Sequence, residues 1–131
     1  EADIGCHDFT YSLLPHKHDL IRSKVIPEAS CINNKPMLFE GFKSSLKVPV
    51  SIDGEGLELS VLKKAEKKDC LVLRIVERFG RRSKGKIYLS GEITEYDLIE
   101  WNRIGEKIIV RGNTTLDFKP FEIRTFLLKN N

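Results

Sequence analysis

The chain has 131 residues, a length that suits one domain, or one domain with a short piece of a neighbour. Its 40% apolar and 31% charged residues are typical of a soluble globular protein. The net charge of +3 is too small to indicate a nucleic acid or an anionic membrane as partner, and no apolar run approaches the roughly 20 residues of a membrane-spanning helix.

The N-terminal part of the chain is predicted to hold one strand and two short helices. Residues 8–14 are rich in aromatic and β-branched side chains, which favours a strand. Apolar residues recur near helical spacing over 16–32, but Pro27 interrupts this stretch and disfavours a single continuous helix. We therefore expect two short helices here, followed by a turn at 33–36.

The remainder of the chain, beyond a weakly patterned loop at 40–56, is patterned for strands. Cys70–Val76 is apolar on both faces apart from Arg74, which predicts a central strand covered on both sides. Turns are expected at 79–85 and 111–113. The predicted strands are residues 48–52, 57–62, 70–76, 86–90, 97–101, 108–110, 114–118 and 121–128.

Short strands separated by turns about every eight to twelve residues are typical of an antiparallel β-sandwich. The expected fold class is therefore mainly β, an antiparallel β-sandwich with a short helical insertion near residues 17–33. We expect two parts, residues 1–45 as the end of a preceding β domain with short helices and residues 46–131 as a C-terminal β-sandwich.

Three stretches, in this order, resemble the C-terminal region of the α-mannosidases of glycoside hydrolase family 38. Residues 5–16 read G-C-H-D-F-T-Y-S-L-L-P-H, similar to the family pattern G-x-H-(E/D)-F-T-Y-x-L-x-P-H. Residues 62–77 contain L-K-K-A-E and L-V-L-R-I-V-E, similar to the family's LK-x-AE followed by LVLRLYE. Residues 118–123 read F-K-P-F-E-I, similar to the family's closing PFEI segment. The chain departs from the pattern at Val76, where the family usually has Tyr.

The resemblance implies a large retaining exo-glycosidase that removes α-linked mannose from glycan ends with a divalent metal, usually zinc. In that family the nucleophilic Asp, the general acid and the metal ligands lie in an N-terminal α/β domain, and none of those motifs occurs here. We therefore expect no catalytic residue, metal ligand or cofactor on this chain. Its expected role is to complete an α-mannosidase by packing against the catalytic domain, and the alternative is a stand-alone carbohydrate-binding β-sandwich.

Two kinds of candidate site can be weighed on the residues themselves. Retaining hydrolysis needs two carboxylates about 5 Å apart, one ionised and one protonated. Most acidic residues here are predicted in hydrophilic turns, where solvated carboxylates are the favoured interpretation. These residues include Asp53, Glu55, Glu66, Asp69, Glu92 and Glu95.

A zinc site is the second candidate, because Cys6, His7, His16 and His18 carry suitable ligand atoms. Their spacing fits no compact zinc motif, and Lys17 places a positive charge between two of them. Surface or hydrogen-bonded histidines are therefore favoured. In the resembled signature strand, His7 and His16 are expected to fix the turn that follows.

Basic and aromatic residues offer two further candidates. The predicted hairpin tip carries Arg78, Arg81, Arg82, Lys84 and Lys86. Such a tip is compatible with a barrel that binds single-stranded nucleic acid, but few aromatic residues lie among these charges, so a solvated turn is favoured.

Trp101 and Tyr96 offer ring faces on which a sugar can stack. For Trp101 a core or interface position is nevertheless the favoured interpretation. The residues expected to be interdomain or substrate-adjacent are His7, Tyr11, His16, Arg78 and Trp101.

Cys6, Cys31 and Cys70 are odd in number and form no CxxC pair, so no disulfide framework is expected. Buried free thiols in a reducing compartment are favoured. Because residues 1–5 also lack the features of a signal peptide, the cytoplasm is the expected location.

The expected partners are the catalytic domain of the parent enzyme and, through it, mannose-containing glycans, with no nucleic acid and no membrane. Apolar residues are concentrated over 5–38, more than a short strand and two short helices can hide. An isolated chain is therefore expected to associate with a second copy through this region.

Overall fold

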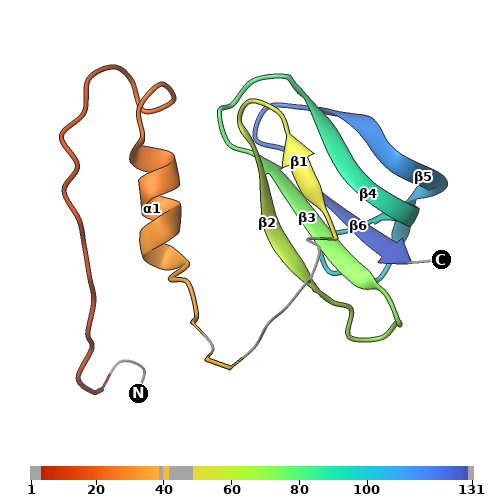
Figure 1. Cartoon of the computed structure of the whole chain (residues 1–131), viewed down its shortest axis with the longest axis horizontal. Coiled ribbons are helices and arrows are strands. Elements are labelled where there is room, and N and C mark those ends of the chain that lie inside the picture. Colours follow the sequence, from red (N-terminus) through yellow and green to blue (C-terminus); the bar gives the residue numbers. More distant parts are fainter. Residues whose placement is uncertain (1–3, 39, 42–48, 130–131) are drawn as a thin grey trace. The chain divides into compact units, whose positions relative to one another are not determined.

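A computed structural model describes residues 4–38, 40–41 and 49–129 of the chain. The chain divides into two compact units, Glu1–Phe42 and Lys43–Asn131. The first unit holds the helix α1, Val25–Asn33, and the second holds a β-sandwich (Figure 1). Each unit is described by itself.

In the described part of the first unit, a single helix replaces the two that were predicted. Pro27 is the third residue of α1, within the first turn, where a backbone N–H has no partner inside the helix. The first helical hydrogen bond runs from the N–H of Glu28 to the carbonyl of Lys24, 3.0 Å. Pro27 therefore fits the start of α1 and does not break it. The strand predicted at 8–14 is also wrong, because this stretch pairs with no other described segment.

The second unit is a mostly antiparallel β structure, which confirms the predicted fold class. Its path of hydrogen-bonded strands is β1-β4-β6-β3-β2, and β5 pairs with β4 off this path. The sheet is so strongly curled that its two end strands, β1 and β2, lie close together, and it nearly closes around one core (Figure 1). The strands are β1 Ser51–Asp53, β2 Leu57–Lys64, β3 Leu71–Glu77, β4 Ser83–Tyr96, β5 Arg103–Phe118 and β6 Ile123–Lys129.

The long strand β4 makes this curl possible because it exchanges partners along its length. It pairs with β5 almost throughout, while its opposite edge meets β1 at residues 86–88 and β6 at residues 92–96. Gly91 lies between these two partners, with a φ of +141°. A Cβ atom at Gly91 would lie 2.6 Å from the carbonyl oxygen of Lys129, so only glycine allows β6 to approach at this bend.

Two predictions in this unit are wrong. Residues 97–101 form a turn and not a strand. Residues 111–113 are not a turn, because they continue β5 in register with Leu89 and its neighbours on β4. A partner of nearly equal length keeps the chain extended through Gly112, which a local turn signal does not reveal.

Strand β3 is central, as its two apolar faces predict, and lies between β2 and β6. On one face Leu73 and Ile75 are fully buried, and Leu71 is partly buried against the same core. On the other face Val72 is fully buried in a smaller cluster. The main core contains Val50, Leu73, Ile75, Ile87, Leu89, Ile93, Val110, Leu116, Phe118, Phe126 and Leu128, and the smaller cluster contains Ala65, Val72 and Leu127.

The central position of β3 gives a first testable prediction. The side chain of Leu73 is 1% exposed. The substitution Leu73→Ala should lower the free energy of unfolding by about 2–5 kcal/mol, because the surrounding core cannot fill the cavity that it leaves. Urea unfolding of the purified chain measures this loss. The matched control is Leu13→Ala, at a side chain 88% exposed, which should change stability by no more than about 0.5 kcal/mol. Equal effects of the two substitutions would contradict the assignment of β3 to the core.

Candidate functional site

A buried carboxylate, which the sequence analysis did not single out, lies at the end of β3. Glu77 is 1% exposed. Its two oxygens accept hydrogen bonds from the backbone N–H groups of Phe79 at 2.8 Å, Gly80 at 2.8 Å and Arg81 at 3.2 Å. A fourth N–H, that of Phe121, donates to the same carboxylate at 2.8 Å. Glu77 therefore joins the turn after β3 to the turn before β6.

The electrostatics of Glu77 suit a structural role. Burial by itself raises the pKa of its carboxyl group, but the four backbone N–H groups outweigh burial and hold the pKa below its ordinary value. The carboxylate is therefore ionised at neutral pH. A general acid in a glycosidase needs the opposite shift, so Glu77 does not have the properties of that acid.

Another acid, Glu95, is half-buried and is held in an ion pair with Arg124. Both of its oxygens accept hydrogen bonds from the guanidinium of Arg124, which raises the pKa of Arg124. That guanidinium also lies 5.4 Å and 5.0 Å from the ring centroids of Phe118 and Phe126. The prediction that Glu95 is a solvated turn residue is therefore wrong, and so is that for Glu92, since both lie in β4 and are half-buried.

The basic residues near the β3–β4 turn are largely paired with acids. Arg78 contacts Glu58 at 2.6 Å, and Arg81 contacts Glu55 at 2.7 Å. Lys84 contacts Asp117 at 3.3 Å. These pairs neutralise most of the local positive charge, which favours a solvated hairpin over a groove for nucleic acid.

The turn between β4 and β5 is held in a fixed conformation by the side chain of Asp97. Its carboxylate accepts hydrogen bonds from the backbone N–H of Trp101 at 2.8 Å and of Asn102 at 3.1 Å, and from the Asn102 amide at 2.7 Å. Desolvation raises the pKa of Asp97, but the hydrogen bonds together outweigh it and hold the pKa below its ordinary value. An ionised Asp97 therefore organises the turn at neutral pH.

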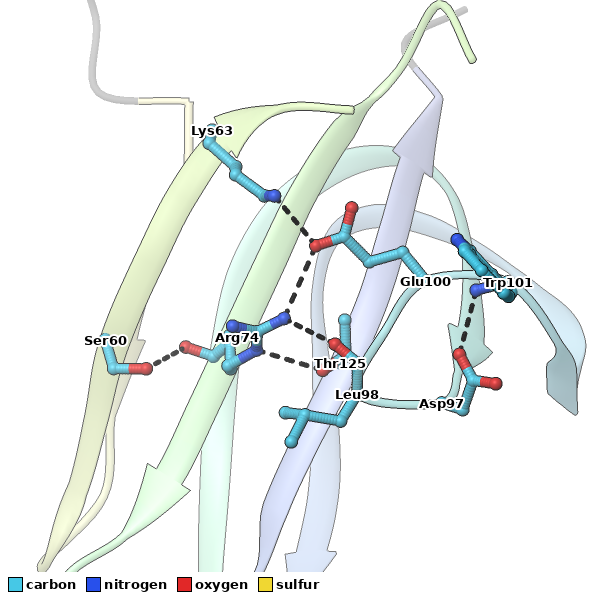
Figure 2. Close-up of polar contacts among 8 residues, drawn as sticks. All are labelled: Ser60, Lys63, Arg74, Asp97, Leu98, Glu100, Trp101 and Thr125. Atoms are coloured by element: carbon cyan, nitrogen blue, oxygen red, sulfur yellow. Dashed lines mark hydrogen bonds and ion pairs between the residues drawn. The ribbon is translucent and has the colours of Figure 1, made fainter. Parts of the chain in front are cut away.

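A second set of contacts holds this turn against the outer face of the sheet, as Figure 2 shows. Glu100 has a φ of +66°, and its Oε1 contacts Lys63 Nζ at 3.0 Å and Arg74 Nη2 at 3.4 Å. Arg74 also donates hydrogen bonds to the carbonyl of Leu98 at 2.8 Å and to Thr125 Oγ1 at 3.2 Å. Arg74, a charged residue in the middle of β3, thus connects the turn to β3 and β6.

The turn leaves Trp101 on the surface, 65% exposed, so Trp101 does not lie in the core, and the interface position stays a prediction. Beside it lies a hollow of about 200 Å³, with Ala65 and Leu127 in its lining. The ammonium of Lys67 lies 4.4 Å from the centroid of the Trp101 ring. The remaining lining residues are Glu66, Lys68, Ile99 and Glu100. An aromatic ring next to apolar and charged groups forms a surface that can bind a small polar molecule.

The N-terminal candidates show no assembled site. Tyr11 is 85% exposed, and its ring stacks on that of Phe9 with centroids 6.4 Å apart. His7 and His16 are also exposed. Their roles as interdomain or substrate-adjacent residues stay predictions, as do those of Arg78 and Trp101.

Among the described residues, no three His, Cys, Asp or Glu side chains lie close enough together to bind a zinc ion. Cys6 and Cys31 are exposed and Cys70 is half-buried, so the expectation of buried thiols is wrong for the first two. The reason is that Cys31 lies in α1, which has no buried residue, and Cys6 lies in irregular chain that provides no core. The part of the chain that the structure describes contains no helix long and apolar enough to cross a membrane.

Comparison with known proteins matches residues 56–126 to the model of the glycosyl hydrolases family 38 C-terminal beta sandwich domain. The chain is 31% identical to alpha-mannosidase G of Dictyostelium discoideum, over 99% of the chain and 13% of that protein. It is also 31% identical to alpha-mannosidase 2C1 of Homo sapiens, over 97% of the chain and 13% of that protein. The chain therefore spans 13% of the length of these relatives.

The contacts of Glu77 predict a specific stability defect. Glu77→Gln should lower the free energy of unfolding by about 1.5–3 kcal/mol, because a neutral amide replaces a charged acceptor and turns an NH2 group toward backbone donors. The folded pKa lies below the unfolded one, so this stabilisation is full above the ordinary glutamate pKa of about 4.3 and is lost as pH falls through the folded value. Urea unfolding between neutral and acidic pH measures both effects.

The control for this prediction is Glu55→Gln, at a carboxylate 76% exposed in an ion pair with the same turn. It should change stability by no more than about 0.5 kcal/mol. The assignment fails if Glu77→Gln is equally mild, or if it leaves the acid dependence of stability unchanged.

Proposed function

This chain belongs to glycoside hydrolase family 38, and from that membership we infer that it forms the C-terminal, non-catalytic β-sandwich of an α-mannosidase. The observation that carries this proposal is the family match over residues 56–126, which runs from the start of β2 into β6. The relatives named as alpha-mannosidases align with nearly the whole chain, which supports the same parent activity.

The chemistry of the acids supports a non-catalytic role for this part. Retaining hydrolysis needs one ionised carboxylate as nucleophile and one protonated carboxyl as acid. Glu77 is saturated by backbone donors, and Glu95 is held by Arg124. Under this proposal the catalytic carboxylates, and the zinc or other divalent metal that the family resemblance implies, are supplied by another domain of the parent.

The exposed N-terminal unit is the part proposed to contact that catalytic domain. Its family signature presents Phe9, Tyr11 and Leu13 to solvent, and a surface of this kind is typical of a protein interface. His7 and His16 lie in the same stretch and would take part in this contact. In the isolated chain, these side chains would instead associate with a second copy.

A reducing compartment suits the proposal, because the exposed thiols of Cys6 and Cys31 are free. We therefore keep the cytoplasm as the proposed location. Mannose-containing glycans would be the substrates of the parent enzyme.

If the catalytic residues lie in another domain and this chain is the non-catalytic part, a reconstitution experiment has a predicted outcome. The purified chain should hydrolyse no aryl α-mannoside, with or without added zinc, because it lacks the nucleophile and the acid. Mixed with the separately produced preceding part of its parent protein, it should raise both the α-mannosidase activity and the thermal stability of that part.

The test variant is the chain with Tyr11→Ser, which removes one exposed ring from the proposed contact. It should restore less α-mannosidase activity than the unmodified chain. Turnover by the chain alone, lost on mutation of one of its own carboxylates, would overturn the proposal. So would a preceding part that is fully active and equally stable without the chain.

A further inference from the structure

The hollow beside Trp101 has the features of a binding site that the proposed hydrolysis does not use. We propose that it binds one neutral hexopyranose ring at the end of a glycan. The observation is the combination of a largely exposed indole ring, an apolar floor and charged side chains around a volume of about 200 Å³. This volume is below the roughly 300–1,000 Å³ of pockets for drug-sized ligands, which suits a single sugar ring.

The backbone of the turn that carries Trp101 is held in a fixed conformation. The backbone N–H of this tryptophan is bound by Asp97, and the preceding residue, Glu100, is held by Lys63 and Arg74 (Figure 2). Because the turn is fixed by these contacts, little conformational freedom is lost when a ligand binds. An exposed tryptophan on a rigid turn therefore fits a recognition role better than a packing role.

The surrounding groups match the two sides of a pyranose. Trp101 and the floor residues Ala65 and Leu127 can contact the C–H face of a sugar ring. The ion pairs and hydrogen bonds of the Glu100 carboxylate with described residues go to Oε1, which leaves Oε2 as an acceptor for a hydroxyl group. Lys67 is exposed and flexible, so its ammonium can move from the indole face to a hydroxyl oxygen.

The charge balance indicates a neutral ligand. The charged residues that line the hollow are two lysines, Lys67 and Lys68, and two glutamates, Glu66 and Glu100. Two positive and two negative side chains give no net attraction for a phosphate or a carboxylate. A neutral sugar, which both donates and accepts hydrogen bonds, uses groups of either sign.

The identity of the sugar as mannose rests on the proposed function, whereas the presence of the site rests on the hollow alone. The molecule provides a direct reporter, because Trp101 is the single tryptophan of the chain. Titration of the purified chain with methyl α-mannoside should produce a saturable change in tryptophan fluorescence. One hexose should bind with a dissociation constant on the order of millimolar. Inorganic phosphate at equal ionic strength should leave the fluorescence unchanged.

Variants are compared by saturation-transfer NMR on the sugar, which needs no tryptophan. Trp101→Ala should weaken binding by about tenfold through loss of stacking, with thermal unfolding unchanged because the side chain is exposed. The matched control is Ile109→Ala, at an apolar side chain 67% exposed that does not line the hollow, and it should bind as the unmodified chain does.

The proposal is overturned if methyl α-mannoside leaves the fluorescence unchanged, or if Trp101→Ala binds the sugar normally. It is also overturned if Trp101 responds only to rising protein concentration or to the preceding part of the parent, which would make the turn a protein interface. None of these results tests the proposed function, which is measured by hydrolysis in the reconstituted enzyme and not by Trp101.

Discussion

The β-sandwich depends on one buried carboxylate at the point where two turns meet. Glu77 leaves the central strand β3 and receives four backbone N–H groups, three from the turn that follows and one from Phe121. If this carboxylate were removed, the four N–H groups would lose their acceptor. The loss in folding free energy would be comparable to that of several hydrogen bonds. The same residue fixes the approach of β6, since its own N–H donates to the carbonyl of Glu122 at 2.9 Å.

Glu77 also explains why two of the family-like stretches occur together. One stretch ends in Glu77, and the other contains Phe121, whose N–H is bound to Glu77 across 44 positions of sequence. Phe121 has a φ of +57°, and its ring lies over Gly80, where a Cβ atom would be 2.4 Å from Phe121 Cζ. The acid, the glycine and the aromatic residue therefore form one structural unit, although Phe121 lies far along the chain from the other two.

Sequence patterns predicted those features that depend on local periodicity. The two apolar faces of β3 correctly indicated a central strand, and the alternation after Gly56 correctly indicated a sandwich. The patterns failed where a distant partner decides the conformation. Residues 97–101 look like a strand, but the contacts of Asp97 and Arg74 hold them as a turn. Glu77 looks like an exposed acid at a strand end, because no local pattern connects it to its distant donor, Phe121.

The central claim is that Glu77 closes the sandwich as an ionised acceptor, and amide hydrogen exchange tests it most directly. In the purified chain at neutral pH, the amides of Gly80 and Phe121 should exchange as slowly as those of β3, although both lie in turns. Their protection should fall together as the pH is lowered through the pKa of Glu77. Rapid exchange of these amides at neutral pH, as in an ordinary exposed turn, would contradict the account.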